Sequence, residues 1–128
     1  MSKLVPFCKG SKFAPYFPIP LYIIRSGLPW TAILVYGFML SRIIGSSENP
    51  LFHDKNGVFI YASIDEMAED LGRGRTAIHD AVNRLVESGF ILKKRMGLNH
   101  SNKYYVMIPS DNRKNERPDN RKSGNPDD

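Results

Sequence analysis

The sequence has 128 residues and a mass of 14.5 kDa, which leaves room for one globular domain. Its single cysteine, Cys8, excludes an internal disulfide framework and a multi-cysteine metal site, and fits a reducing compartment such as the cytoplasm. The longest apolar stretch, residues 28–40, is shorter than the roughly 18–20 residues that a membrane-spanning helix needs. The proline-interrupted N-terminus has no continuous apolar segment, so we expect no secretory signal.

The net charge of +5 is concentrated in one part of the chain. Residues 1–70 carry six Lys or Arg and six Asp or Glu, and residues 106–128 carry five of each. Residues 71–105 carry seven Lys or Arg against two Asp or Glu, so the whole excess lies in 35 residues. Such segregation favours a polyanionic partner, whereas a solvated surface with scattered lysines does not predict it.

The N-terminal residues 1–24 are predicted to be extended or polyproline-like, without a helix, because four prolines interrupt them: Pro6, Pro15, Pro18 and Pro20. The aromatic residues Tyr16, Phe17 and Tyr22 make this segment too apolar to remain in solvent. We expect it to pack on the domain or on a second copy of it, with nucleic-acid stacking as the lesser alternative.

A buried core helix is predicted from Pro29, which suits a first helical turn, to about Ile44, with its end at Gly45. The residues at helical spacing are Trp30, Ile33, Leu34, Gly37, Leu40, Ser41 and Ile44. Farther on, the dipeptide Asn56-Gly57 predicts a β-hairpin turn before the β-prone run 58–62.

Ser63 and Glu66 form the pattern of a capping box, which predicts the start of a short helix. Its apolar face would consist of Ile64, Met67, Ala68 and Leu71. Its outer face is acidic, with Asp65, Glu66, Glu69 and Asp70. These carboxylates favour the helix N-terminus but repel phosphate, so this helix is not expected to lie on DNA.

A turn at residues 72–74 leads to a second helix, predicted at 75–88, that Gly89 ends. Gly74 stands at its cap, at a cost of a few tenths of a kcal/mol relative to a serine-type cap. Two β-prone runs follow, at 90–96 and 103–108, joined by the polar loop 97–102, which predicts a second hairpin. From Ser110 on no side chain is apolar, so we expect disorder there.

The predicted fold is α+β and mainly helical: a winged helix-turn-helix with two β-hairpins and a disordered C-terminal tail. The second helix would enter a major groove, and Arg side chains can contact guanine bidentately while Asn contacts adenine. The candidate contacts on this helix are Arg73, Arg75, Thr76, His79, Asn83 and Arg84. Those on the wing are Lys93, Lys94, Arg95, Asn99, His100, Asn102 and Lys103. Asp80 either reads cytosine or pairs with Arg84.

Other chemistry is not expected from this sequence. His53, His79 and His100 lack metal-ligand spacing, and the run at 72–75 lacks the lysine and hydroxyl of a phosphate-binding P-loop. Nothing places Ser, His and Asp together for catalysis. We therefore expect no enzyme activity, no catalytic residue, no metal and no cofactor.

The order of these segments resembles the N-terminal domain of RepA-type replication initiators of Gram-positive plasmids. The resemblance covers about residues 13–108 and is carried by YFPIPLYII, LVYGFMLSR, NGVFIYASIDEMAEDLG, TAIHDAVNRLVESGFI and KKRMGLNHSNKYYV. It implies a winged helix that binds repeated origin sites in double-stranded DNA, commonly as a homodimer. It also implies contact with host replication proteins through a separate C-terminal domain, which nothing in these 128 residues resembles.

The expected organisation is a flexible arm at 1–12, a winged-helix DNA-binding domain at 13–108, and a disordered tail or linker at 109–128. The expected function is sequence-specific binding at a plasmid replication origin, which initiates or licenses replication in the cytoplasm without a membrane partner. Two alternatives remain open at this point: a transcriptional regulator that binds an operator, and a winged helix that only contacts proteins.

Overall fold

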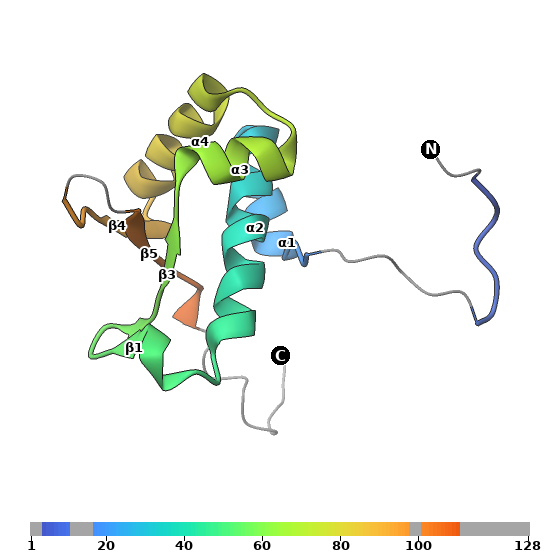
Figure 1. The fold of residues 1–128 in the computed structure, drawn as a ribbon. Coiled ribbons are helices and arrows are strands. Elements are labelled where there is room, and N and C mark those ends of the chain that lie inside the picture. Colours follow the sequence, from blue (N-terminus) through green and yellow to red (C-terminus); the bar gives the residue numbers. More distant parts are fainter. Residues whose placement is uncertain (1–3, 11–16, 98–100, 111–128) are drawn as a thin grey trace.

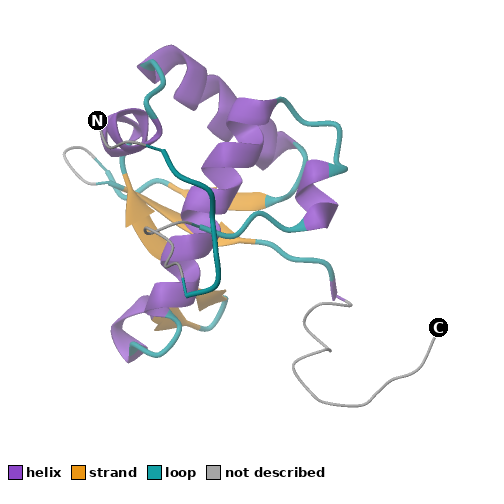
Figure 2. Ribbon diagram, turned by 90° about the vertical axis from the view of Figure 1, so that its right-hand side faces the viewer, coloured by secondary structure: helices purple, strands orange, loops and turns teal. Residues whose placement is uncertain are grey.

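The computed structural model describes residues 4–10, 17–97 and 101–110. It has four α-helices, one short 3-10 helix and two small antiparallel sheets within these residues, which confirms the predicted α+β class. Figure 1 shows helix α2 running through the middle of the fold, with α3 and α4 at one end and the strand β1 at the other. The three-stranded sheet lies along one side of α2 (Figures 1 and 2).

The N-terminal segment contains a helix, so the prediction that residues 1–24 exclude one is wrong. Helix α1 (Leu21–Ile24) begins directly after Pro20, which acts as its N-cap in the extended conformation. The four residues that follow contain no proline, and a proline before the first turn removes no helical hydrogen bond. Phe17 and Tyr22 pack against the core of the same chain, whereas Tyr16 lies outside the described residues.

Helix α2 (Trp30–Ser46) is the buried helix that the sequence predicts, with Pro29 as its N-cap. It continues through Gly45, where an end was predicted, because a glycine in a helix costs only about 1 kcal/mol. Its middle is buried on every side, from Val35 to Met39, so the predicted single face is too narrow. Trp30 and Ile44, at the two ends of that face, are 69% and 56% exposed.

The predicted hairpin at Asn56-Gly57 is confirmed: β1 (His53–Asp54) pairs with β2 (Gly57–Val58) after the short 3-10 helix η1 (Pro50–Phe52). The strand β3 (Ile60–Ala62) leaves this hairpin and joins another sheet. That sheet has the order β3-β5-β4, with β4 (Ile91–Lys94) and β5 (Asn102–Val106) as the two strands of the wing. The wing therefore shares its sheet with a strand that precedes both helices of the helix-turn-helix.

Helices α3 (Ile64–Leu71) and α4 (Arg75–Glu87) form the predicted helix-turn-helix. Gly72 ends α3 in the left-handed conformation, with φ of 65°, which favours glycine because a Cβ atom is strained there. Helix α4 ends at Glu87, one residue before the predicted end, with Ser88 as its C-cap. Its buried residues are Ile78, Ala81, Val82 and Leu85, and they pack mainly on α2.

The capping box forms only in one direction. The Ser63 hydroxyl accepts a hydrogen bond from the Glu66 backbone N–H at 3.1 Å, as predicted. The Glu66 carboxylate instead pairs with Arg42 of α2, so one of the four acids on the predicted outer face is turned toward another helix. This ion pair joins α3 to α2, which the sequence pattern did not indicate.

Within the described ranges, no helix is long and apolar enough to cross a membrane. Of the tail predicted to be disordered, 109–128, the structure describes Pro109 and Ser110, and residues 111–128 lie outside the described part of the chain. Residues 98–100, which include the candidate contacts Asn99 and His100, also lie outside the described residues.

Candidate nucleic-acid interface

The face of α4 that does not pack on α2 carries the polar residues that the sequence singled out. Thr76 and His79 are exposed, and Asn83 is half-buried beside His79, with 3.4 Å between its Nδ2 and the His79 Nδ1. Arg75 and Arg84 flank this row on opposite sides of the helix. Gly74 is the N-cap and offers no side-chain acceptor, so the first N–H groups of α4 stay open to an external anion.

Arg75 is already oriented by a neighbouring acid. Its Nε lies 2.6 Å from Oδ1 of Asp65, the second residue of α3. Both side chains are 74% exposed, so solvent screens the pair and a competing acceptor displaces it at little cost. The contact uses Nε, which leaves both terminal nitrogens of the guanidinium for another partner.

Asp80 and Arg84 do not form the ion pair that was one of the two readings of Asp80: the described residues contain three ion pairs, and none includes Asp80. Arg73 lies in the turn before α4, with its Nη1 only 3.4 Å from the Gly72 carbonyl oxygen. Arg73 and Arg84 are both exposed to solvent.

The two lysines of β4 point to opposite faces of the sheet. Lys93 follows Ile91 by two positions and is half-buried on the core side, opposite Tyr104. Lys94 lies on the outer face with Leu92 and is exposed. Side chains alternate along a strand, so the consecutive lysines and Arg95 spread over both faces of the wing.

Lys103 on β5 is held by the β1–β2 hairpin. Its Nζ lies 3.0 Å from Oδ2 of Asp54 and 4.0 Å from the centre of the Phe59 ring. The Tyr105 hydroxyl donates a hydrogen bond of 2.5 Å to the same Asp54 oxygen. Because Lys103 stands directly opposite Lys94 in the sheet, the carboxylate of Asp54 also offsets a repulsion between like charges.

These contacts shift the pKa values of the pair in opposite directions. The hydrogen bond from Tyr105, with help from Lys103, lowers the pKa of the Asp54 carboxyl to about 2. The hydrogen bond to Asp54 raises the pKa of the Lys103 amine. Both groups are therefore charged at neutral pH, and Lys103 is partnered inside the protein with 12% of its side chain exposed.

The remaining cations of the basic segment lie without an ion-pair partner among the residues that the structure describes. They are Arg73, Arg84, Lys93, Lys94 and Arg95. Asn102, another of the predicted wing contacts, is half-buried in β5 opposite Ala62. The structure thus gives the surface of α4 and the wing an excess of unpaired positive charge.

Two residues of this region were not among the sequence candidates. Asp54 lies just before the predicted Asn56-Gly57 turn, but its partner Lys103 is 49 positions away in the chain, and no local sequence pattern links the two residues. Ile64, which was assigned to the apolar face of α3, also lines a hollow of about 310 Å³ together with Arg75, Thr76 and His79. The sequence pattern assigned Ile64 to the core-facing side of α3 and gave no sign that it also lines this hollow.

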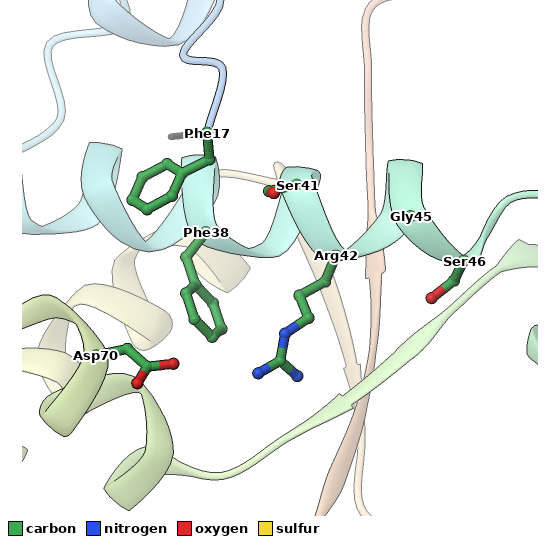
Figure 3. A pocket seen from close by; sticks show the side chains of 7 residues that line it. All are labelled: Phe17, Phe38, Ser41, Arg42, Gly45, Ser46 and Asp70. Atoms are coloured by element: carbon green, nitrogen blue, oxygen red, sulfur yellow. The ribbon is translucent and has the colours of Figure 1, made fainter. Parts of the chain in front are cut away.

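A second hollow, of about 560 Å³ (Figure 3), is lined by Phe17 and by residues of α2 and α3, with none from α4 or the wing. Phe38, Arg42 and Asp70 point into it from α2 and α3. The Arg42 guanidinium is 4.8 Å from the Phe38 ring centre and pairs with Glu66. Since Asp70 adds a second carboxylate nearby, this hollow is unsuited to phosphate. No cluster of three or more His, Cys, Asp or Glu side chains in the described ranges could hold a metal ion.

Comparison with known proteins shows a match to one family model. The family model described as the N-terminus of replication initiator protein A (RepA) matches residues 25–116, which include α2, the helix-turn-helix and the wing. No match was found among curated proteins.

Solved structures share the fold at low sequence identity. One described as "Structure of Rep-DNA complex" is 20% identical, with a TM-score of 0.61, over 83% of this chain and 92% of that one. An "N-Terminal domain of DNA binding protein" is 18% identical, with a TM-score of 0.61, over 87% of this chain and 100% of that one. A "Structure of MDR initiator" is 17% identical, with a TM-score of 0.60, over 81% and 91%.

Proposed function

The chain belongs to the family of replication initiator protein A N-termini, and on this premise we propose that it binds double-stranded DNA at repeated sites of a plasmid replication origin. Binding would initiate or license replication of the plasmid. The observation that carries the proposal is the excess of unpaired positive charge on α4 and the wing, in a chain whose other segments are neutral. A duplex of phosphates is the polyanion that fits such a surface.

In this proposal α4 enters the major groove with its N-terminal half. The terminal nitrogens of Arg75 contact O6 and N7 of a guanine while Asp65 holds its Nε. Thr76, His79 and Asn83 face the neighbouring base edges. Arg73 and Arg84, at the two flanks, contact phosphates and fix the register of the helix on the duplex.

The wing contributes contacts of two kinds. Lys93, Lys94 and Arg95 bind phosphates, while the loop residues Asn99 and His100, together with Asn102 at the start of β5, reach the backbone or the adjacent minor groove. We assign Lys103 a different part: paired with Asp54, it holds β5 against the β1–β2 hairpin and so fixes the base of the wing.

The proposed action is recognition without catalysis, and it requires no cofactor. It places the chain in the cytoplasm, where plasmid DNA lies. We further propose a homodimer on the repeats, supported by three exposed apolar side chains on α1 and at the first position of α2: Leu21, Ile24 and Trp30. Contact with host replication proteins would belong to a separate domain. Sedimentation velocity of the chain, alone and with a two-repeat duplex, tests the dimer.

The function is tested by fluorescence anisotropy on two duplexes of equal length, across a salt series. One duplex carries the repeats of the replicon that encodes the protein, and the other has a random sequence. We expect the repeats to bind at least about 10³-fold more tightly, with a steep salt dependence. Equal and weak binding to both would contradict the proposal.

A triple variant provides the control for electrostatics. Replacing Lys93, Lys94 and Arg95 by alanine should weaken binding to both duplexes. If the variant bound the repeats as tightly as the unmodified chain, the wing would not contact DNA.

A further inference from the structure

The hollow between α3 and α4 lies within the proposed major-groove surface. It has a volume of about 310 Å³ and is lined by Ile64 from α3 and by Arg75, Thr76 and His79 from the first two turns of α4. Thr76 and His79 are exposed, and Ile64 is half-buried with its inner side on the core. The hollow therefore opens where α4 would meet the edges of the bases.

The lining combines hydrocarbon with hydrogen-bond donors. Ile64 and the methyl group of Thr76 are apolar, whereas the Thr76 hydroxyl, the Arg75 guanidinium and an N–H of His79 can donate. No carboxylate belongs to the lining, and Asp65 is paired with the Nε of Arg75. An occupant that fits must present a small apolar group next to an acceptor.

Among the base edges of the major groove, thymine alone has this pair of features: its 5-methyl group stands beside the O4 acceptor. Cytosine presents an amino donor and no methyl group. Guanine presents two acceptors, and adenine presents an acceptor with a donor. The chemistry of the lining thus selects one base.

We propose that this hollow receives the edge of a thymine, with the 5-methyl group against Ile64 and Thr76 and with O4 facing the Thr76 hydroxyl and an N–H of His79. Ile64 is then a specificity-determining residue that lies on the helix before the recognition helix. The inference rests on the proposed function, because it assumes that α4 lies in the major groove of a specific site.

The experiment replaces each thymine of one repeat in turn by deoxyuridine, which removes the methyl group and leaves O4 and the base pairing in place. Fluorescence anisotropy gives the affinity of each duplex. We expect one position at which the loss of the methyl group weakens binding about fourfold, the effect of burying one such carbon. At that position 5-methylcytosine, which keeps the methyl group but lacks O4, should bind more tightly than unmethylated cytosine.

Two variants connect this position to the hollow. Ile64→Ala and Thr76→Ser each remove apolar atoms from the lining, and both should bind the thymine and the deoxyuridine duplexes more nearly equally. Thr76 is exposed, so Thr76→Ser keeps the test valid if Ile64→Ala does not fold. Ile44→Ala, which truncates an exposed isoleucine at the far end of α2, is the matched control and should keep the full discrimination.

The two failures are distinguishable. If the repeats bind specifically but no single deoxyuridine weakens binding, or if both variants keep the discrimination, the thymine inference is overturned and the proposed function stands. If the repeats bind no better than random DNA, the proposed function fails and this inference fails with it.

Discussion

Arg75 and Lys103 belong to the same basic segment, yet their surroundings differ. Arg75 has 74% of its side chain exposed and shares only its Nε with Asp65. Lys103 has 12% exposed and lies between Asp54 and the Phe59 ring. An exposed guanidinium exchanges one acceptor for another at little cost, whereas withdrawing Lys103 would leave the Asp54 carboxylate without its cation. Of these two residues, we therefore expect Arg75 and not Lys103 to contact DNA.

Arg75→Ala should weaken binding to the repeats by about 1–3 kcal/mol and relax the preference at one base position, because a bidentate contact to guanine is lost. Affinities for a set of repeats with single base changes measure both effects. Lys9→Ala removes one exposed charge outside α4 and the wing and serves as the control. An equal loss on random DNA would show that Arg75 contacts phosphate instead.

Lys94→Ala and Lys103→Met separate a phosphate contact from an internal cation. Lys94 is exposed and unpaired among the described residues, so its removal should weaken binding to all duplexes alike and lower the salt slope by about one. Lys103→Met should leave the salt slope unchanged. Anisotropy titrations at four salt concentrations give both slopes. A lower slope for Lys103→Met would mean that Lys103 leaves Asp54 to bind phosphate.

At the scale of the elements, the β1–β2 hairpin acts as a support for the wing. Phe59 lies 6.0 Å from both Phe52 and Tyr105, measured between ring centres, so an aromatic cluster covers the outer face of β5. Asp54 adds two polar contacts to the same strand. The position of the wing is thus fixed from outside the wing.

Asp54→Asn should make the protein less sensitive to acid. The pKa of this carboxyl falls from 3.8 to about 2 in the folded protein, so the carboxylate stabilises the fold above about pH 4 and loses this effect as the pH falls toward 2. Urea unfolding midpoints between pH 6 and pH 3 measure it. The difference between unmodified and variant protein should be largest at pH 6 and shrink at pH 3. A constant difference would show that the charge of Asp54 contributes nothing.

At the scale of the whole molecule, one hydrogen-bond chain joins segments from both ends of the domain. Tyr36, fully buried in α2, donates to the Met107 carbonyl oxygen at 2.9 Å, directly after β5. Its hydroxyl oxygen lies 2.5 Å from that of Tyr22 on α1, which must donate in this pair. Burial raises the pKa of the Tyr36 hydroxyl, with a further contribution from Tyr22, so Tyr36 stays neutral and keeps its proton for Met107.

Tyr36→Phe should lower the free energy of unfolding by about 1–3 kcal/mol, because the Met107 carbonyl loses the donor of a part-buried hydrogen bond. Tyr22→Phe should cost less, since the half-buried Tyr22 donates only to Tyr36. Urea denaturation followed by circular dichroism compares the two. A greater loss for Tyr22→Phe would contradict this hydrogen-bond order.

The sequence alone predicted the elements whose causes are local. Each of these signals acts within a few residues of the chain. The structure has a helix start at Ser63 and Glu66, helix ends at Gly72 and Gly89, and a turn at Asn56-Gly57. The basic segment was likewise readable, because charge is counted without coordinates.

Only the tertiary structure decided which of those residues meet. Lys103 and Asp54 pair although they are 49 positions apart in the chain, and Tyr36 bonds Met107 across 71 positions. Strand β3 pairs with β5 of the wing, although the whole helix-turn-helix lies between them in the sequence. Such contacts depend on how the elements pack, which no short-range pattern contains. The sequence therefore identified the basic segment, whereas packing decided that Lys103 is held by Asp54, that Lys93 is half-buried and that the other cations are exposed.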